Sequence, residues 1–173
     1  MNAVDVPGSV ANFAVHYGGT LKLMTAIVVA VLLGMAIVGL VHYRNGALYL
    51  LGMVAMPLAI LLGAFACTVL RYEVSSAGID VVRPIGRKRI AATVTAIRAD
   101  NDALKGALRT FGNGGLFSFN GYYRLANYGS CRLWVTDMSK LVVIHGDHGC
   151  VVVSPAERAR FVALVAQTYG VKP

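Results

Sequence analysis

The sequence predicts a membrane α-helical hairpin followed by a mainly β domain that ends in one α-helix. Its composition is the first observation, because a chain of 173 residues that is 57% hydrophobic and 14% charged is too apolar for an ordinary soluble domain. The mean hydropathy of +0.64 agrees with this. Two long uncharged runs near the beginning and short alternating runs in the second half are the other two observations.

The two uncharged runs, residues 23–41 and 47–70, predict membrane-spanning helices. Each run reaches the roughly 20 apolar residues that a helix needs to cross about 30 Å of hydrocarbon. A signal peptide is the alternative for the first run, but a signal peptide has a shorter apolar region behind a basic start. Here a largely neutral segment, residues 1–22, precedes the run, and the second run follows at once. We therefore expect no cleavage.

Only residues 42–46 separate the two runs, so the helices must form an antiparallel hairpin with both termini on one side of the membrane. Positively charged residues cluster at the outer ends of the hairpin, whereas Arg44 alone stands in the loop. The positive-inside rule then predicts a multi-pass protein whose termini and residues 71–173 are cytoplasmic. The outer basic residues are Lys22, Arg71, Arg83, Arg87, Lys88 and Arg89.

Small residues recur four apart in both runs, which is the spacing that favours close packing of membrane helices. Folding the chain back on itself places the two series opposite each other, so we expect them to hold the hairpin together. The alternative is that the same residues bind a different membrane protein. Pro57 predicts a kink in the second helix. The six helix-packing residues are Ala26, Ala30 and Gly34 in the first run and Ala55, Ala59 and Gly63 in the second.

From residue 71 onward, short apolar alternations are separated by turn residues, a pattern typical of an antiparallel sheet. The pattern gives about seven strands, enough for a small barrel or sandwich. The predicted strands are residues 72–76, 79–83, 89–98, 116–124, 130–136, 141–145 and 150–154.

The last segment has a different period. Ser154, Pro155 and Glu157 match a capping box, with Ser154 as the N-cap and Pro155 at the first helical position. Apolar residues then recur at helical spacing until Gly170. A C-terminal helix over residues 155–169 is predicted to cap the open end of the sheet structure.

Residues 71–170 resemble a bacterial pleckstrin-homology (PH) domain. The resemblance rests on four stretches of the sequence: YEVSSAGIDV, RTFGNGGLFSFNGYYR, YGSCRLWVTD with the following LVVIHG, and VVVSPAERARFVALV. It implies a PH-like barrel or sandwich without a shared catalytic activity. Similar domains occur in small membrane-anchored bacterial proteins, which implies the bacterial inner membrane, and bacterial PH-type barrels resemble some that assemble into rings.

The stretch FGNGGLFSFNGYYR, residues 111–124, is rich in glycine and aromatic residues. It lacks the last glycine and the following helix of a dinucleotide-binding fingerprint, and it lacks the Lys and Ser/Thr of a P-loop. We therefore interpret it as a turn and core segment of the sheet. The alternative is a contact site for a partner protein, formed by Phe117, Phe119, Tyr122 and Tyr123.

The densest positive cluster consists of Arg83, Arg87, Lys88 and Arg89. Each such residue near an anionic membrane surface contributes about 1 kcal/mol of attraction, so the cluster predicts weak contact with anionic lipid headgroups. The alternative is an ordinary solvated turn. The net charge of +8 forms no long basic stripe, so no nucleic-acid partner is expected.

No residue pattern predicts a cofactor, a metal site or a catalytic group. His145, His148 and Cys150 offer too few ligands for a structural zinc, and Gly146 with Asp147 is explained as a hairpin connection. The cysteines are Cys67, Cys131 and Cys150. They have no close CxxC pair, and in a reducing cytosol we expect them to be buried apolar residues without disulfides. No nucleophile elbow or carboxylate pair is present.

These observations predict a noncatalytic membrane-anchored adaptor or scaffold whose PH-like domain positions a protein partner at the inner membrane. An accessory or assembly subunit of a larger membrane complex, bound through the hairpin, is one alternative, and a homo-oligomer is compatible with either. A membrane enzyme of unrecognised type is a second alternative, disfavoured because the predicted spans carry almost no polar residue.

Overall fold

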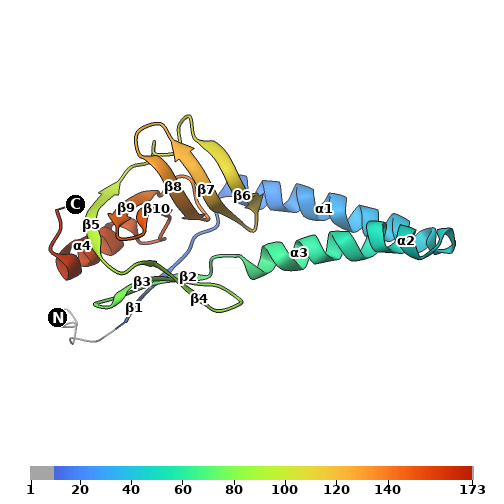
Figure 1. Cartoon of the computed structure of the whole chain (residues 1–173), viewed down its shortest axis with the longest axis horizontal. Helices are drawn as coiled ribbons and strands as arrows, with labels where there is room; N and C mark the ends of the chain where they lie inside the picture. Colours follow the sequence, from blue (N-terminus) through green and yellow to red (C-terminus); the bar gives the residue numbers. More distant parts are fainter. Residues whose placement is uncertain (1–9, 173) are drawn as a thin grey trace.

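The computed structural model describes residues 10–172 and consists of a long helical hairpin attached to a β domain (Figure 1). Residues 1–9 of the predicted N-terminal segment and residue 173 of the predicted C-terminal domain lie outside the described residues. The elements confirm the predicted fold class: two apolar helical arms near the N-terminus are followed by a mainly β domain with a C-terminal helix, and one short strand precedes the arms.

Both arms of the hairpin are long and apolar enough to cross a membrane. The first is α1, Gly19–Val41, and a short 3₁₀ turn, Tyr43–Asn45, connects it to the second. The second arm comprises α2 (Ala47–Leu50), a π-helical turn (Leu51–Ala55) and α3 (Met56–Ala66). Pro57 explains the π turn, because proline has no backbone N–H to donate to the preceding turn. The arm ends at Ala66, and residues 67–70 lead into the β domain instead of extending the helix to residue 70.

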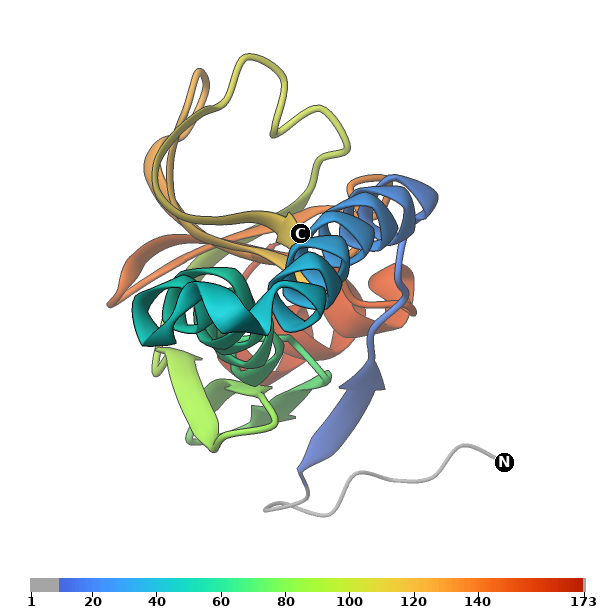
Figure 2. The ribbon, with the colours of Figure 1, turned by 90° about the vertical axis from the view of Figure 1, so that its right-hand side faces the viewer.

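The β domain contains two sheets that pack as a sandwich and do not close into a barrel. Viewed along the hairpin, the sheets lie on opposite sides of the helix roots (Figure 2). The first sheet has the order β1-β2-β3-β4, with β1 Ala11–Ala14, β2 Arg71–Ser75, β3 Gly78–Val82 and β4 Arg87–Ala91. The second has the order β5-β9-β10-β8-β7-β6, with β5 Val94–Ala99, β6 Leu108–Leu116, β7 Ser118–Leu125, β8 Gly129–Val135, β9 Val142–Gly146 and β10 Gly149–Val153.

The single strand predicted over residues 89–98 is two strands that belong to different sheets. Asp147 Oδ1 accepts hydrogen bonds from the backbone N–H groups of Ala92 and Thr93 at 2.8 and 3.1 Å, which satisfies the backbone where the chain passes from one sheet to the other. These bonds hold the pKa of Asp147 below its ordinary value. One strand pair departs from the expected antiparallel arrangement, because β8 and β10 are parallel.

Strand β1, which the sequence analysis did not predict, joins the chain before the hairpin to the domain after it. It pairs antiparallel with β2, from Ala11 opposite Val74 to Ala14 opposite Arg71. Phe13 is buried, and its ring packs edge-on against Phe161 with the centroids 5.0 Å apart. The first sheet therefore depends on residues from both sides of the hairpin.

A buried tyrosine connects the two sheets. Tyr72 on β2 donates its hydroxyl hydrogen bond to the carbonyl of Trp134 on β8 at 2.5 Å and accepts one from the N–H of Ser154 at 3.1 Å. Burial raises the pKa of Tyr72 to about 12 because the charged phenolate would lose its water.

The C-terminal helix α4, Arg158–Tyr169, begins later than residue 155 and ends before Gly170, which adopts the left-handed conformation of a helix C-cap. The predicted capping box is not formed. Ser154 is buried, and its hydroxyl accepts hydrogen bonds from the N–H groups of Thr136 and Asp137 at 2.8 and 3.2 Å. The Ser154 hydroxyl thus makes a tertiary contact with residues 136 and 137 instead of capping the helix that follows it.

We expect Phe13→Ala to destabilise the full-length protein by about 3–5 kcal/mol, the usual cost of removing a buried phenylalanine. Phe111→Ala is the matched control, because Phe111 is 76% exposed and its loss should change the free energy of unfolding by less than about 0.5 kcal/mol. Denaturant titration of the β domain in detergent micelles measures both. Equal stabilities would show that β1 is not part of the folded core.

The raised pKa of Tyr72 predicts an alkaline loss of stability. Because the folded pKa of about 12 lies above the ordinary value of 10.0, stability is complete below pH 10 and falls as the pH rises toward 12. The loss attributable to Tyr72 amounts to about 2–3 kcal/mol. Tyr72→Phe should be less stable at neutral pH by about 1–3 kcal/mol, because the Ser154 N–H and the Trp134 carbonyl lose a buried partner, and it should lack this alkaline component. Identical pH profiles for the two proteins would contradict the assignment.

Candidate functional site

The root of the first helix is hydrogen-bonded to the turn between β6 and β7. Thr25 Oγ1 donates to the carbonyl of Gly115 at 3.1 Å and accepts from the N–H of Phe117 at 3.0 Å. Thr25 thus provides hydrogen-bond partners for two backbone groups beside an apolar helix, where an unpaired backbone group would cost folding free energy.

The root of the second helix is attached to the same β-hairpin. Asn120 donates its side-chain amide to the carbonyl of Cys67 at 2.9 Å, and Tyr17 donates its hydroxyl to the carbonyl of Val69 at 3.2 Å. The rings of Phe65 and Phe117 meet edge-on with centroids 5.9 Å apart. These contacts and the pairing of β1 with β2 fix the domain to both helical arms.

The glycine-rich stretch is a β-hairpin made of β6 and β7, not a phosphate-binding loop. Gly112 and Gly121 lie opposite each other in the two strands and have positive φ angles of 120° and 139°. A Cβ atom at either position would meet backbone of the other strand at 2.3 or 2.2 Å, so only glycine fits. The turn itself contains Phe117 with a φ of 63°.

The four aromatic residues predicted to bind a partner occupy different environments. Phe117 belongs to the junction with the helical hairpin, and Phe119 is buried in the core. Tyr122 is half-exposed and Tyr123 is partly buried. Of this set, the structure therefore leaves only Tyr122 exposed, while Phe117 and Tyr123 are partly buried.

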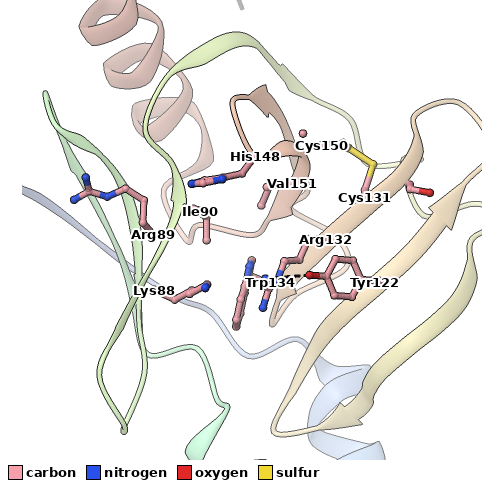
Figure 3. Close-up of a pocket in the computed structure, with 12 residues that line it drawn as sticks. Lys88, Arg89, Ile90, Tyr122, Cys131, Arg132, Trp134, His148, Cys150 and Val151 are labelled. Carbon is pink, nitrogen blue, oxygen red and sulfur yellow. Dashed lines mark hydrogen bonds between the residues drawn. A yellow bond between two sulfur atoms is a disulfide. The ribbon is translucent and has the colours of Figure 1, made fainter.

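The basic cluster is divided by the alternation of strand β4. Arg87 forms an ion pair with Glu73 at 3.0 Å, and Arg89 forms a two-pronged pair with Asp80 at 2.9 and 3.1 Å. Lys88, between them, points to the opposite face, toward Trp134 (Figure 3). The guanidinium of Arg83 lies 5.8 Å from the centroid of the Trp134 ring. The four residues thus do not form one surface.

A cleft of about 410 Å³ lies between the two sheets where β4 faces β8. Lys88 lines one wall, whereas Arg132 and Trp134 line the other, and His148 from the turn between β9 and β10 stands at the edge (Figure 3). The Arg132 guanidinium carbon lies 4.8 Å from the centre of the Trp134 ring and 5.2 Å from that of Tyr122. No carboxylate belongs to the described residues that line this cleft.

Sequence reasoning did not identify Arg132 and Trp134 as site residues. A signal was present in SCRLWVT, because Arg132 and Trp134 alternate with the apolar Cys131, Leu133 and Val135. Alternation places the arginine and the tryptophan on one face of β8. The strand opposite them was not predictable from this pattern.

Cys131 and Cys150 form a disulfide, so the expectation of unpaired cysteines is wrong for these two residues. They lie directly opposite each other on the parallel strands β8 and β10, with Cα atoms 4.5 Å apart, close enough for a bond. The spacing in the sequence did not reveal this because it depends on the parallel register. Cys67 is unpaired.

The small residues predicted to pack the hairpin are not at its closest contact. That contact is at Gly39, where an added Cβ would meet Met53 and Val54 side chains at 2.7 and 2.8 Å. Space is open around Gly34 and Gly63, since the arms diverge toward the domain (Figure 1). The four alanines of the set, Ala26, Ala30, Ala55 and Ala59, are exposed.

Residues 10–172 contain no group of three or more His, Cys, Asp or Glu side chains arranged to hold a metal ion. His145 is on β9, and the predicted hairpin connection at Gly146 and Asp147 joins β9 to β10. His148 lies 3.5 Å from Asp147, whose other oxygen is used by the backbone of Ala92 and Thr93.

The sandwich, its C-terminal helix and the apolar hairpin define a small β module carried on two potential membrane helices. Residues 70–168, more than half of the chain, match the family model described as Bacterial PH domain, and the chain belongs to this family. The match confirms the resemblance identified from the sequence. PH domains are generally noncatalytic binding modules. Comparison with curated proteins and with solved structures finds no match.

Proposed function

We propose that this protein is a noncatalytic membrane adaptor whose PH domain positions a protein partner at the bacterial inner membrane. The observation that carries the proposal is the attachment of the domain to both helical arms through Thr25, Asn120 and the pairing of β1 with β2. A freely tethered domain needs no such contacts. A domain that is attached to both helices presents the same surface at a fixed distance and orientation relative to the membrane.

The partner-facing surface in this proposal is the β6–β7 hairpin. Tyr122 on β7 is exposed and Tyr123 is partly buried, and β6 adds Leu108 and Phe111, which are 69% and 76% exposed. Strand β6 is at the edge of the second sheet, with no strand on its outer side among residues 10–172. An exposed edge with apolar side chains suits the addition of an extended segment from another protein.

Contact with anionic lipid is a weak and nonspecific part of the proposal. Arg87 and Arg89 each form an ion pair with a carboxylate. Lys88 and Arg83 are the members of the basic cluster that have no ion pair among the described residues. Two cations near an anionic surface contribute about 2 kcal/mol, which orients a domain but is not needed to anchor it.

The second candidate function is an accessory or assembly subunit of a membrane complex, held through the hairpin. The outward position of Ala26, Ala30, Ala55 and Ala59, and the open space at Gly34 and Gly63, favour contact with a further membrane helix over packing within the hairpin. A second copy of this chain is one such partner.

Photo-crosslinking in cells distinguishes these functions. A crosslinking phenylalanine analogue at position 111 or 122 of the full-length protein should capture one discrete partner, and the same analogue at exposed Thr95 on the opposite edge strand, β5, should not. Capture only from position 59 would support the accessory subunit, and a crosslinked dimer of the chain itself would support a homo-oligomer. Equal capture from positions 95 and 111, or none from position 111, would contradict the adaptor.

The cytoplasmic side of the domain is also part of the proposal. The distribution of Lys and Arg supports it, and the pairing of β1 with β2 requires the chain on either side of the hairpin to be on the same side of the membrane. The disulfide between Cys131 and Cys150 speaks against it, because glutathione and thioredoxin keep cytosolic thiols reduced.

Thiol counting in cells tests the side of the membrane. If the domain is cytoplasmic, acid quenching followed by a mass-tagged maleimide should modify Cys67, Cys131 and Cys150, because the pair would be held as thiols. A Cys67→Ala variant, which should lose one tag, calibrates the count. A single tag that becomes three only after reduction would place the domain in an oxidising compartment.

A further inference from the structure

We propose that the cleft between β4 and β8 is a binding site for a phosphate group. This inference goes beyond the adaptor role and does not depend on it. The cleft differs from the exposed basic loop considered for lipid contact, because it combines one member of that cluster, Lys88, with residues of the second sheet.

The electrostatics of the cleft favour an anion. Lys88 approaches from the first sheet and Arg132 from the second, and the described lining contains no carboxylate to neutralise either one. Arg89, although it also borders the cleft, is paired with Asp80 and points away from the cavity (Figure 3). Two cations held on facing walls repel each other, and an anion between them removes that repulsion.

The cleft also contains donors that the protein leaves without a partner. Trp134 is 3% exposed, and its indole N–H meets no acceptor among the described residues. The Nε of Arg132 is buried and equally unpartnered. Buried donors are nearly always hydrogen-bonded, so these two point to an acceptor that enters the cleft from outside the chain.

A phosphate group fits this set better than a carboxylate. The donors come from Lys88, Arg132 and Trp134 on two walls, and a phosphate presents at least three acceptor oxygens in a tetrahedral arrangement, whereas a carboxylate has two in one plane. A cavity of about 410 Å³ also leaves room for the group that carries the phosphate. The bearer is either a soluble phosphorylated molecule or a phospholipid headgroup.

The chain provides its own reporter, because Trp134 is its one tryptophan. Selectively excited tryptophan fluorescence of the full-length protein in bicelles of neutral phosphatidylcholine should change saturably when inorganic phosphate is added at constant ionic strength, and chloride should produce no such change. In a parallel sample, phosphatidic acid replaces part of the neutral lipid and no phosphate is added. A response to soluble phosphate indicates a soluble ligand, and a response to phosphatidic acid alone indicates a headgroup.

Two variants locate the response. Lys88→Met and Arg132→Met should each weaken binding by about tenfold, the loss of one charge-assisted hydrogen bond. Lys105→Met is the matched control: it removes the same charge from an exposed position outside the cleft and should bind as the unaltered protein does. Thermal unfolding verifies that each variant is folded. No saturable change in either lipid sample, or equal affinity in Lys88→Met, Arg132→Met and the unaltered protein, would overturn the proposal.

Discussion

The pairing of β1 with β2 is the constraint on which the rest of the structure depends. These strands flank the hairpin in the sequence, so their alignment fixes both helix roots to the same domain. The hairpin of β6 and β7 then contacts the first root through Thr25 and the second through Asn120. Hydrogen bonds at this boundary hold the apolar helices and the sheets in a fixed relation to each other.

Sequence reasoning succeeded where the signal was long and local. The uncharged runs predicted both apolar helical arms, and alternation with turn residues predicted most strands after residue 70. It missed features that distant residues determine. Strand β1 is short and its partner is beyond the hairpin, and the break after β4 depends on Asp147 from another part of the chain. Ser154 matches a helix cap by sequence, yet its hydroxyl accepts hydrogen bonds from two backbone N–H groups that follow β8.

The candidate sites were predicted less well than the fold, for a related physical reason. A cluster of positive charge in the sequence does not reveal which members face carboxylates in neighbouring strands. Glu73 forms an ion pair with Arg87, and Asp80 forms one with Arg89. Lys88 instead lines a cleft together with Arg132, a residue far along the chain. The aromatic residues of the glycine-rich stretch also occupy different environments. Phe117 packs at the junction with the helices and Phe119 in the core, while Tyr122 is exposed. Strand alternation sorts side chains into faces, but only tertiary pairing decides what each face meets.

The contact between Phe13 and Phe161 joins the first described strand to the last helix, and this orders the biosynthesis of the protein. Both apolar arms precede α4 in the chain, so they are synthesised while the environment of Phe13 is still incomplete. Until the C-terminal residues emerge, Phe13 lacks the ring of Phe161 against which it packs in the folded protein. Synthesis must therefore reach α4 before the first described strand can take its final place in the core.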